Sequence, residues 1–163
     1  MKTKGRVWKF GDDINTDLIF PHAAFRAPVE EQAKLVFSTN RPGWAEIVQP
    51  TDLIVSGRNF GTGSSRPGAA LLKRLQIGAV VSSSINGLFF RNCISYGLPA
   101  LQCESVADSF REGDIAEIDL ATGTVLNRRT GNLLYGTKLS ASMIDILKQG
   151  GIENLLRNRG LIE

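Results

Sequence analysis

The sequence predicts an α/β fold, in which helices flank a partly parallel sheet and an antiparallel β meander follows toward the C-terminus. From the N-terminus to Cys103, short apolar runs that suit buried strands alternate with stretches of helical spacing. Beyond Asp114, short strand-like runs separated by glycine turns replace that alternation. Alternating strands and helices favour parallel pairing, whereas short strands with tight turns favour antiparallel pairing. A chain of 163 residues can bury one core, so we expect a single domain over 1–163.

The N-terminal segment predicts a strand, a polar loop and a helix, in that order. Residues 6–10 alternate between apolar and polar side chains enough for a strand. Residues 11–17 are rich in Gly, Asp and Asn, which make turns. Residues 29–37 have helical spacing, and the Asn-Arg-Pro-Gly run at 40–43 is a break.

The central part of the chain repeats a strand–helix unit. Residues 53–56 and 78–84 are apolar runs typical of buried strands, and 98–103 is a third such run. Pro67 has the fixed φ that suits the first turn of a helix after the first of these strands. Asn86 can cap the helix that follows the second strand.

The C-terminal third predicts the meander and two helices. Short strands are expected within 115–120, 124–126 and 133–135, with glycines marking the turns between them. Two helical segments follow, at 142–148 and 152–157, and a pair of glycines divides them.

The composition is that of an ordinary globular protein, with 42% hydrophobic and 21% charged residues. The net charge is +3 and the basic residues are scattered, so a nucleic-acid partner is not indicated. The longest uncharged stretch, 75–90, is interrupted by serines, an asparagine and glycines, so no membrane partner is expected either.

The two cysteines, Cys93 and Cys103, fit a reduced, cytoplasmic protein and are expected to be core residues. The N-terminus leads straight into a strand, without the pattern of a signal peptide. An iron–sulfur cluster normally takes three or four thiolates, so two cysteines cannot hold one by themselves.

The turn after the first central strand reads Gly61-Thr62-Gly63-Ser64-Ser65-Arg66. No lysine lies in this turn, which excludes a Walker phosphate loop, and Arg66 stands where a dinucleotide loop needs its third glycine. An arginine can hold a carboxylate with two parallel hydrogen bonds, and a helix N-terminus favours anions. The turn therefore predicts a carboxylate-binding site beside a serine hydroxyl, although serines at this place can also serve only to cap the helix.

A second polar group, Asp13, Asn15, Thr16 and Asp17, lies in the 11–17 loop near His22 and Arg26. Paired carboxylates can perform acid–base chemistry. Asp and Asn side chains also make turns and cap helices. The residues alone leave both interpretations open.

Four segments together resemble one known family. They are the Gly-Asp-Asp-Ile-Asn-Thr-Asp run at 11–17, the turn at 61–66, the Phe-Phe-Arg-Asn-Cys-Ile-Ser-Tyr-Gly-Leu-Pro run at 89–99, and the C-terminal meander with its helices. In this order they resemble the small subunits of isopropylmalate isomerases, which are swivelling β/β/α domains of the aconitase superfamily. The resemblance covers essentially the whole chain.

The resemblance implies a hydro-lyase or isomerase that removes and re-adds water on a hydroxy-dicarboxylate. It implies a separate large subunit that carries a [4Fe–4S] cluster, so this chain alone should be inactive. Ser64 matches the general base, and Ser65 and Gly63 belong to the same anion-binding site. Arg66 matches the residue that binds the substrate carboxylate. Asp17 matches an active-site aspartate, and Arg26 falls in the loop that tunes the variable side group of the substrate.

A serine hydroxyl is a weak base unless its alkoxide is stabilised. The donors available in sequence are the backbone N–H groups of 61–65, the following helix N-terminus and Arg66, in a site dried by the partner subunit.

Three positions depart from the family pattern, which continues Ser-Ser-Arg-Glu-His and has a cysteine between the two glycines. This chain has Pro67-Gly68 and Thr62 there. The leading expectation is isomerisation of isopropylmalate in leucine biosynthesis by a heterodimer. The alternatives are a hydratase for another alkylmalate, citraconate- or homocitrate-type acid, or a non-catalytic domain that binds a carboxylate metabolite or RNA.

Overall fold

The computed structural model describes residues 1–64 and 66–163. Seven strands form one sheet in the order β4-β3-β2-β1-β5-β6-β7. The strands are β1 (Lys2–Lys9), β2 (Leu53–Ser56), β3 (Ala79–Ser82), β4 (Ala100–Gln102), β5 (Ile115–Asp119), β6 (Thr124–Asn127) and β7 (Leu133–Tyr135).

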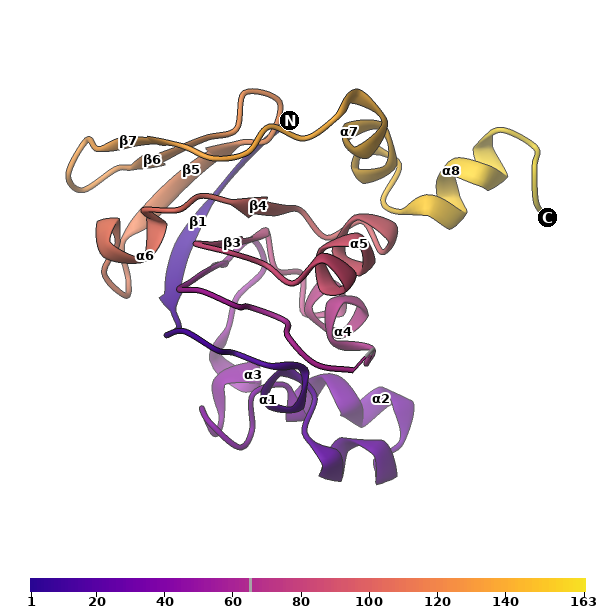
Figure 1. The fold of residues 1–163 in the computed structure, drawn as a ribbon. Helices are drawn as coiled ribbons and strands as arrows, with labels where there is room; N and C mark the ends of the chain where they lie inside the picture. The colour runs from indigo at the N-terminus through magenta and orange to yellow at the C-terminus, as the bar shows by residue number, and fades with distance from the viewer. Residues whose placement is uncertain (65) are drawn as a thin grey trace.

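Short helices connect and cover the strands, as Figure 1 shows. The α-helices are α1 (Thr16–Ile19), α2 (Val29–Gln32), α3 (Trp44–Ile47), α4 (Gly68–Arg74), α5 (Gly87–Ser95), α6 (Val106–Ser109), α7 (Ala141–Lys148) and α8 (Ile152–Asn158). Two 3-10 helices, η1 (His22–Arg26) and η2 (Ala33–Leu35), lie between α1 and α3. In Figure 1 the last helix, α8, and the C-terminus extend away from the sheet.

Strand β1 joins the parallel half of the sheet to the antiparallel half. Its last residues pair in parallel with β2, with Val7 opposite Leu53, and its first residues pair in antiparallel fashion with β5, with Thr3 opposite Ile118. β2, β3 and β4 continue the parallel half, and β5, β6 and β7 form the meander. The expected partly parallel sheet and C-terminal meander are confirmed, and the two belong to one continuous sheet.

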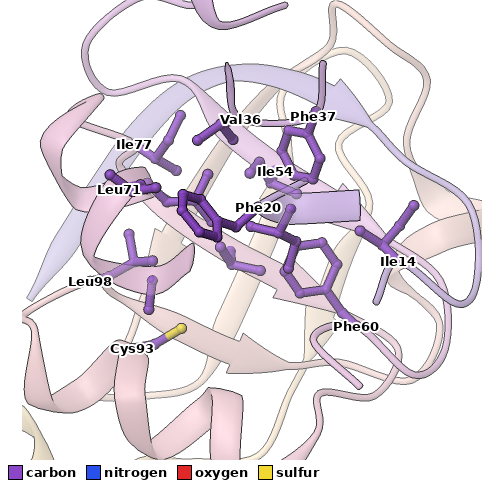
Figure 2. Packing of buried hydrophobic residues seen from close by; sticks show 14 of the residues in the cluster. Ile14, Phe20, Val36, Phe37, Ile54, Phe60, Leu71, Ile77, Cys93 and Leu98 are labelled. Atoms are coloured by element: carbon purple, nitrogen blue, oxygen red, sulfur yellow. The ribbon is translucent and has the colours of Figure 1, made fainter. Parts of the chain in front are cut away.

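Both faces of the sheet are buried in its parallel half, at β2 and β3. Successive residues of a strand point to opposite faces, so Ile54 packs in one hydrophobic cluster while Leu53 and Val55 pack in the other. Helices α1 to α5 and the segments between them cover the first cluster, shown in Figure 2 with Phe20 at its centre. The second cluster lies under α6, α7 and the meander. Burial on both faces explains why β2 and β3 are continuous apolar runs.

Most expected elements are present, with shifted ends. β2 spans the expected residues, and Asn86 caps α5 by accepting the backbone N–H of Leu88 at 3.0 Å. β1 begins at Lys2, earlier than expected, because β5 supplies a pairing partner for its polar first residues. The four-residue helices α1, α3 and α6 were not expected, since a single turn carries no periodic pattern.

Candidate active site

The loops that follow β1 and β2 meet at one end of the sheet. Because these strands are parallel, their carboxyl ends lie together, which is where α/β folds bind ligands. Four backbone hydrogen bonds join the loops: Gly57 N–H to Gly11 O at 3.1 Å, Asp13 N–H to Arg58 O at 2.8 Å, Thr16 N–H to Thr62 O at 2.9 Å, and Gly61 N–H to Ile14 O at 2.7 Å. The acidic loop and the glycine-rich turn therefore form one unit.

Most polar side chains of the acidic loop stabilise that unit. The Asp12 carboxylate accepts the backbone N–H of Arg58 at 2.7 Å, which lowers the pKa of this carboxyl. Asp13 accepts the side-chain amide of Asn59 at 2.7 Å. Asn15 caps α1 by accepting the N–H of Leu18 at 2.9 Å. Turn-making and capping therefore account for these three residues, and Asp17 stands apart from them.

The glycines of the turn allow close contacts with neighbouring side chains. Gly61 has φ +76°, and a Cβ there would lie 2.3 Å from Cγ of Phe89. Gly63 has φ +122°, and a Cβ there would lie 2.6 Å from Oγ1 of Thr16. The Thr62 hydroxyl donates to the carbonyl of Asn59 at 2.9 Å and so tightens the turn. Side chains at Gly61 and Gly63 would force this turn away from its supports.

Ser64 follows Gly63 and is exposed at the tip of the turn. It lines a narrow recess between the turn and α5, together with Thr16, Gly61, Gly63, Arg66, Leu88, Phe89 and Asn92. The recess has no room for a sphere the size of a water molecule, whereas sites that enclose a small ligand hold roughly 300–1,000 Å³. This surface alone therefore does not enclose a hydroxy acid. Ser65, the other predicted serine of the anion-binding site, lies outside the described residues.

Arg66 is held by three contacts from the α1–η1 segment. Its Nη1 donates to the carbonyl of Phe20 at 2.9 Å, and its Nη2 lies 2.5 Å from the Asp17 carboxylate. Its guanidinium carbon lies 4.9 Å from the centre of the Phe25 ring, a cation–π contact. The guanidinium is thus fixed in position at the edge of the recess that Ser64 lines.

Pro67 and Gly68 belong to the packing of α4. Pro67 is the N-cap residue, so α4 begins at Gly68, just after the proline expected in its first turn. A Cβ at Gly68 would lie 2.8 Å from Cγ2 of Ile19. The glycine therefore permits the close approach of α4 to α1.

The structure brings together four of the predicted site residues. Asp17, Gly63, Ser64 and Arg66 lie around the recess or in contact with its lining. Arg26 is exposed at the end of η1, and within the described chain it makes no hydrogen bond or ion pair with them. Its neighbour Phe25 contacts Arg66.

Three further residues of this region were not predicted as site residues. Thr16 and Asn92 lie inside the sequence segments that resemble the family, and this was the one feature of the sequence that could have indicated them as site residues. Phe25 carries no such signal, because only the fold places its ring under the guanidinium of Arg66.

The cysteines do not form a metal site. Cys93 packs in the first hydrophobic cluster and Cys103 in the second, on opposite faces of the sheet, and burial raises the pKa of both thiols. Both were expected to be core residues, and this is confirmed. Across residues 1–64 and 66–163, no three His, Cys, Asp or Glu side chains are grouped as metal ligands. The chain therefore does not fit an iron–sulfur cluster of its own.

None of the helices in the described part of the chain is long and apolar enough to span a lipid bilayer.

Comparison with known proteins places this arrangement in a family context. The family described as Aconitase C-terminal domain matches residues 24–105, which include the glycine-rich turn and Arg66. The isopropylmalate/citramalate isomerase small subunit of Methanocaldococcus jannaschii is 42% identical, over 96% of this chain and 94% of that protein. The 3-isopropylmalate dehydratase small subunit 1 of Thermotoga maritima is also 42% identical, over 96% of each chain.

A solved structure shares the fold. The crystal structure of a 3-isopropylmalate dehydratase from Methanocaldococcus jannaschii superposes with a TM-score of 0.90 and 34% sequence identity. The superposition covers 99% of this chain and 96% of that chain.

Proposed function

This chain belongs to the family of aconitase C-terminal domains, and on that premise we propose that it is the small subunit of a 3-isopropylmalate dehydratase. The reaction is the interconversion of 2-isopropylmalate and 3-isopropylmalate in leucine biosynthesis. The names of relatives at about 42% identity support this substrate. The enzyme is a hydro-lyase, and its small subunit works with a large one.

One observation carries the proposal for the site. The Arg66 guanidinium is buried to 15% exposure and fixed by Asp17 and the Phe20 carbonyl, beside a recess that the exposed Ser64 also lines. A fixed guanidinium is suited to orient a carboxylate, and a nearby hydroxyl can then reach the carbon next to it. A base and a cation that orients the carboxylate suit the elimination of water from a hydroxy-dicarboxylate.

We propose the following roles for the residues of this chain. Arg66 binds a substrate carboxylate, and Asp17 orients Arg66. Ser64, as its alkoxide, removes the proton from the carbon beside that carboxylate, while the hydroxyl on the neighbouring carbon leaves and a double bond forms. Re-addition of water in the opposite sense returns the proton from Ser64 to the substrate and gives the isomer. The sequence supports Ser65 as a second member of the anion-binding site and Arg26 as a contact for the variable side group.

The large subunit completes the site in this proposal. The small size of the recess supports a second protein surface opposite Ser64. The [4Fe–4S] cluster of the family belongs to that large subunit, because the described residues of this chain do not fit it. The partners are therefore the large subunit and the small hydroxy acid, with no nucleic acid or membrane. The two free thiols fit a cytoplasmic heterodimer.

A related acid is the second candidate substrate. The Methanocaldococcus relative is named for both isopropylmalate and citramalate. Pro67 and Gly68 depart from the Glu-His of the family pattern, next to Arg66. A change beside Arg66 can alter which side group the site accepts.

Reconstitution tests both the class and the substrate. The chain is purified alone and with its large subunit, and turnover is measured on 2-isopropylmalate, citramalate and homocitrate. We expect no turnover by the chain alone, and the fastest turnover by the pair on 2-isopropylmalate. The Ser64→Ala pair should lose most of its rate, whereas Ser38→Ala, away from the recess, should not. A Ser64→Ala pair that keeps its rate would show that Ser64 is not the base.

A further inference from the structure

The hydroxyl of Thr16 is buried without a hydrogen-bond partner. Thr16 is 5% exposed, and its Oγ1 contacts no donor or acceptor among the described residues at hydrogen-bonding distance. Trp44 Nε1 is the other buried side-chain polar atom in this condition within the described chain, and it lies in the aromatic core. Native proteins rarely leave a buried hydroxyl unpaired, and such a group calls for an explanation in function or in another state of the protein.

Thr16 is held so that this hydroxyl faces the glycine-rich turn. Its backbone N–H donates to Thr62 O at 2.9 Å, and its carbonyl accepts the N–H of Phe20 at 2.9 Å. Its Oγ1 would lie 2.6 Å from a Cβ on Gly63, so it occupies the space that the missing side chain leaves. These two hydrogen bonds hold the backbone of Thr16 beside the glycine-rich turn.

The same side chain lines the recess of Ser64. Ser64 directly follows Gly63, and both line the recess with Thr16, Arg66 and Asn92. The charged groups at this place are Arg66 and the Asp17 carboxylate that pairs with it. The guanidinium of Arg66 already contacts Asp17 and the Phe20 carbonyl through two of its N–H groups. The Thr16 hydroxyl is therefore a buried donor that has no acceptor among residues 1–64 and 66–163, beside the serine.

We propose that Thr16 is a positioning residue for Ser64: in the complex with the large subunit and substrate, the Thr16 hydroxyl donates a hydrogen bond to Ser64 Oγ. This rests on the proposed function, in which Ser64 accepts a proton. A donated hydrogen bond stabilises the alkoxide of Ser64 and holds its oxygen toward the substrate. Gly63 lacks a Cβ at the place where one would block this approach.

Two substitutions of Thr16 separate this role from a structural one. Thr16→Val keeps the shape and removes the hydroxyl, and replacing an unpaired buried hydroxyl by a methyl group is close to neutral for folding. The melting temperature of the free chain should stay the same or rise. Thr16→Ser keeps the hydroxyl and removes a buried methyl group, so the melting temperature should fall.

Activity of the reconstituted pair should follow the opposite order. For Thr16→Val we expect kcat to fall roughly 10- to 100-fold with little change in KM, as for the loss of a hydrogen bond to a charged group. The rise of kcat/KM with pH, which reports the base of the free enzyme, should move to higher pH. Thr16→Ser should keep kcat and the pH profile of the unaltered pair, and so should Thr39→Val at an exposed threonine.

Three results would overturn the inference. In the first, the Thr16→Val pair keeps the full kcat. In the second, kcat falls together with the melting temperature while the pH profile stays unchanged. A wild-type pair that turns over no hydroxy acid would remove the proposed function and this inference with it. That last failure is recognised in the wild type, before any variant is compared.

Discussion

Asp17 and Arg66 form an ion pair at 2.5 Å across the junction of the two loops that build the candidate site. The Asp17 side chain is 66% exposed and that of Arg66 only 15%, so the guanidinium is the fixed member. The Phe20 carbonyl and the Phe25 ring hold it from the same segment. The segment after β1 therefore sets where a carboxylate can be gripped beside Ser64.

Replacing Arg66 by lysine should weaken substrate binding and turnover. A lysine keeps the charge but cannot hold a carboxylate with two parallel hydrogen bonds or lie flat over Phe25. We expect kcat/KM of the reconstituted pair to fall roughly 10- to 100-fold, the range for losing a charge-assisted hydrogen bond. Arg157→Lys, on the exposed side of α8, is the matched control and should leave kcat/KM unchanged. Equal kcat/KM for the two variants would contradict the role of Arg66.

Replacing Asp17 by asparagine should affect activity more than stability. The carboxylate is mostly exposed, so the ion pair contributes less than about 1 kcal/mol to folding. The Arg66 guanidinium loses one of its three contacts, so its orientation toward substrate is less defined. We expect a nearly unchanged melting temperature and a clear loss of kcat/KM. A fall in stability without a fall in kcat/KM would mean that the pair serves the fold alone.

The loss of folding free energy on replacing a glycine by alanine should depend on the φ angle of the glycine and on the atoms that the new Cβ would meet. Gly63→Ala meets both a φ of +122° and the Thr16 hydroxyl, and we expect it to cost roughly 2–4 kcal/mol of folding free energy. At Gly113 the φ angle is +86° but nothing lies near an added Cβ, so we expect Gly113→Ala to cost about 1–2 kcal/mol of folding free energy. Gly11→Ala meets neither obstacle and should be close to neutral. Urea unfolding of the three variants checks the order, and a Gly63 variant as stable as that of Gly11 would refute it.

Asp114 should make folding stability depend on pH in the acid range. Hydrogen bonds from Arg129 hold the pKa of this carboxyl well below its usual value, and Arg111 N–H and Asn127 add to them. The unfolded chain therefore binds the proton more readily, with a pKa of about 3.9. This stabilisation is present at neutral pH and is lost progressively as the pH falls from about 5 through the lowered pKa.

Unfolding measured between pH 7 and pH 3 tests this prediction. Asp114→Asn should be less stable at pH 7 and should lose less stability on acidification than the unaltered chain. Asp108→Asn, at an exposed carboxylate, is the control, and its free energy of unfolding should fall with pH as that of the unaltered chain does. An Asp114→Asn curve parallel to that of the unaltered chain would contradict the assignment.

The local elements were largely predictable. The apolar run at β2, the Asn86 cap of α5 and the glycine turns of the meander are local signals, and each marks the element that the structure contains. The early start of β1 was not predictable, because Lys2 to Gly5 form a strand only against β5. The single turn of α6 carried too few residues for a periodic signal.

The candidate site was predictable as a set of residues but not as a set of contacts. Ser64, Arg66 and Asp17 stand in segments that the sequence alone singles out. The contact of the Phe25 ring with Arg66 was not predicted, because it depends on how the η1 segment folds back over the turn that carries Arg66.

The alternation of the longer strands and helices, the family resemblance and the residues able to hold a carboxylate and move a proton could all be read from the sequence alone. These follow from side-chain periodicity, from the backbone freedom of glycine and from the chemistry of each side chain, which are local properties. The tertiary structure decided that Asp17 meets Arg66 and that the Thr16 hydroxyl faces Gly63. Those contacts join distant parts of the chain, and they exist because β1 pairs in parallel with β2, with Val7 opposite Leu53, which brings the two following loops to one end of the sheet.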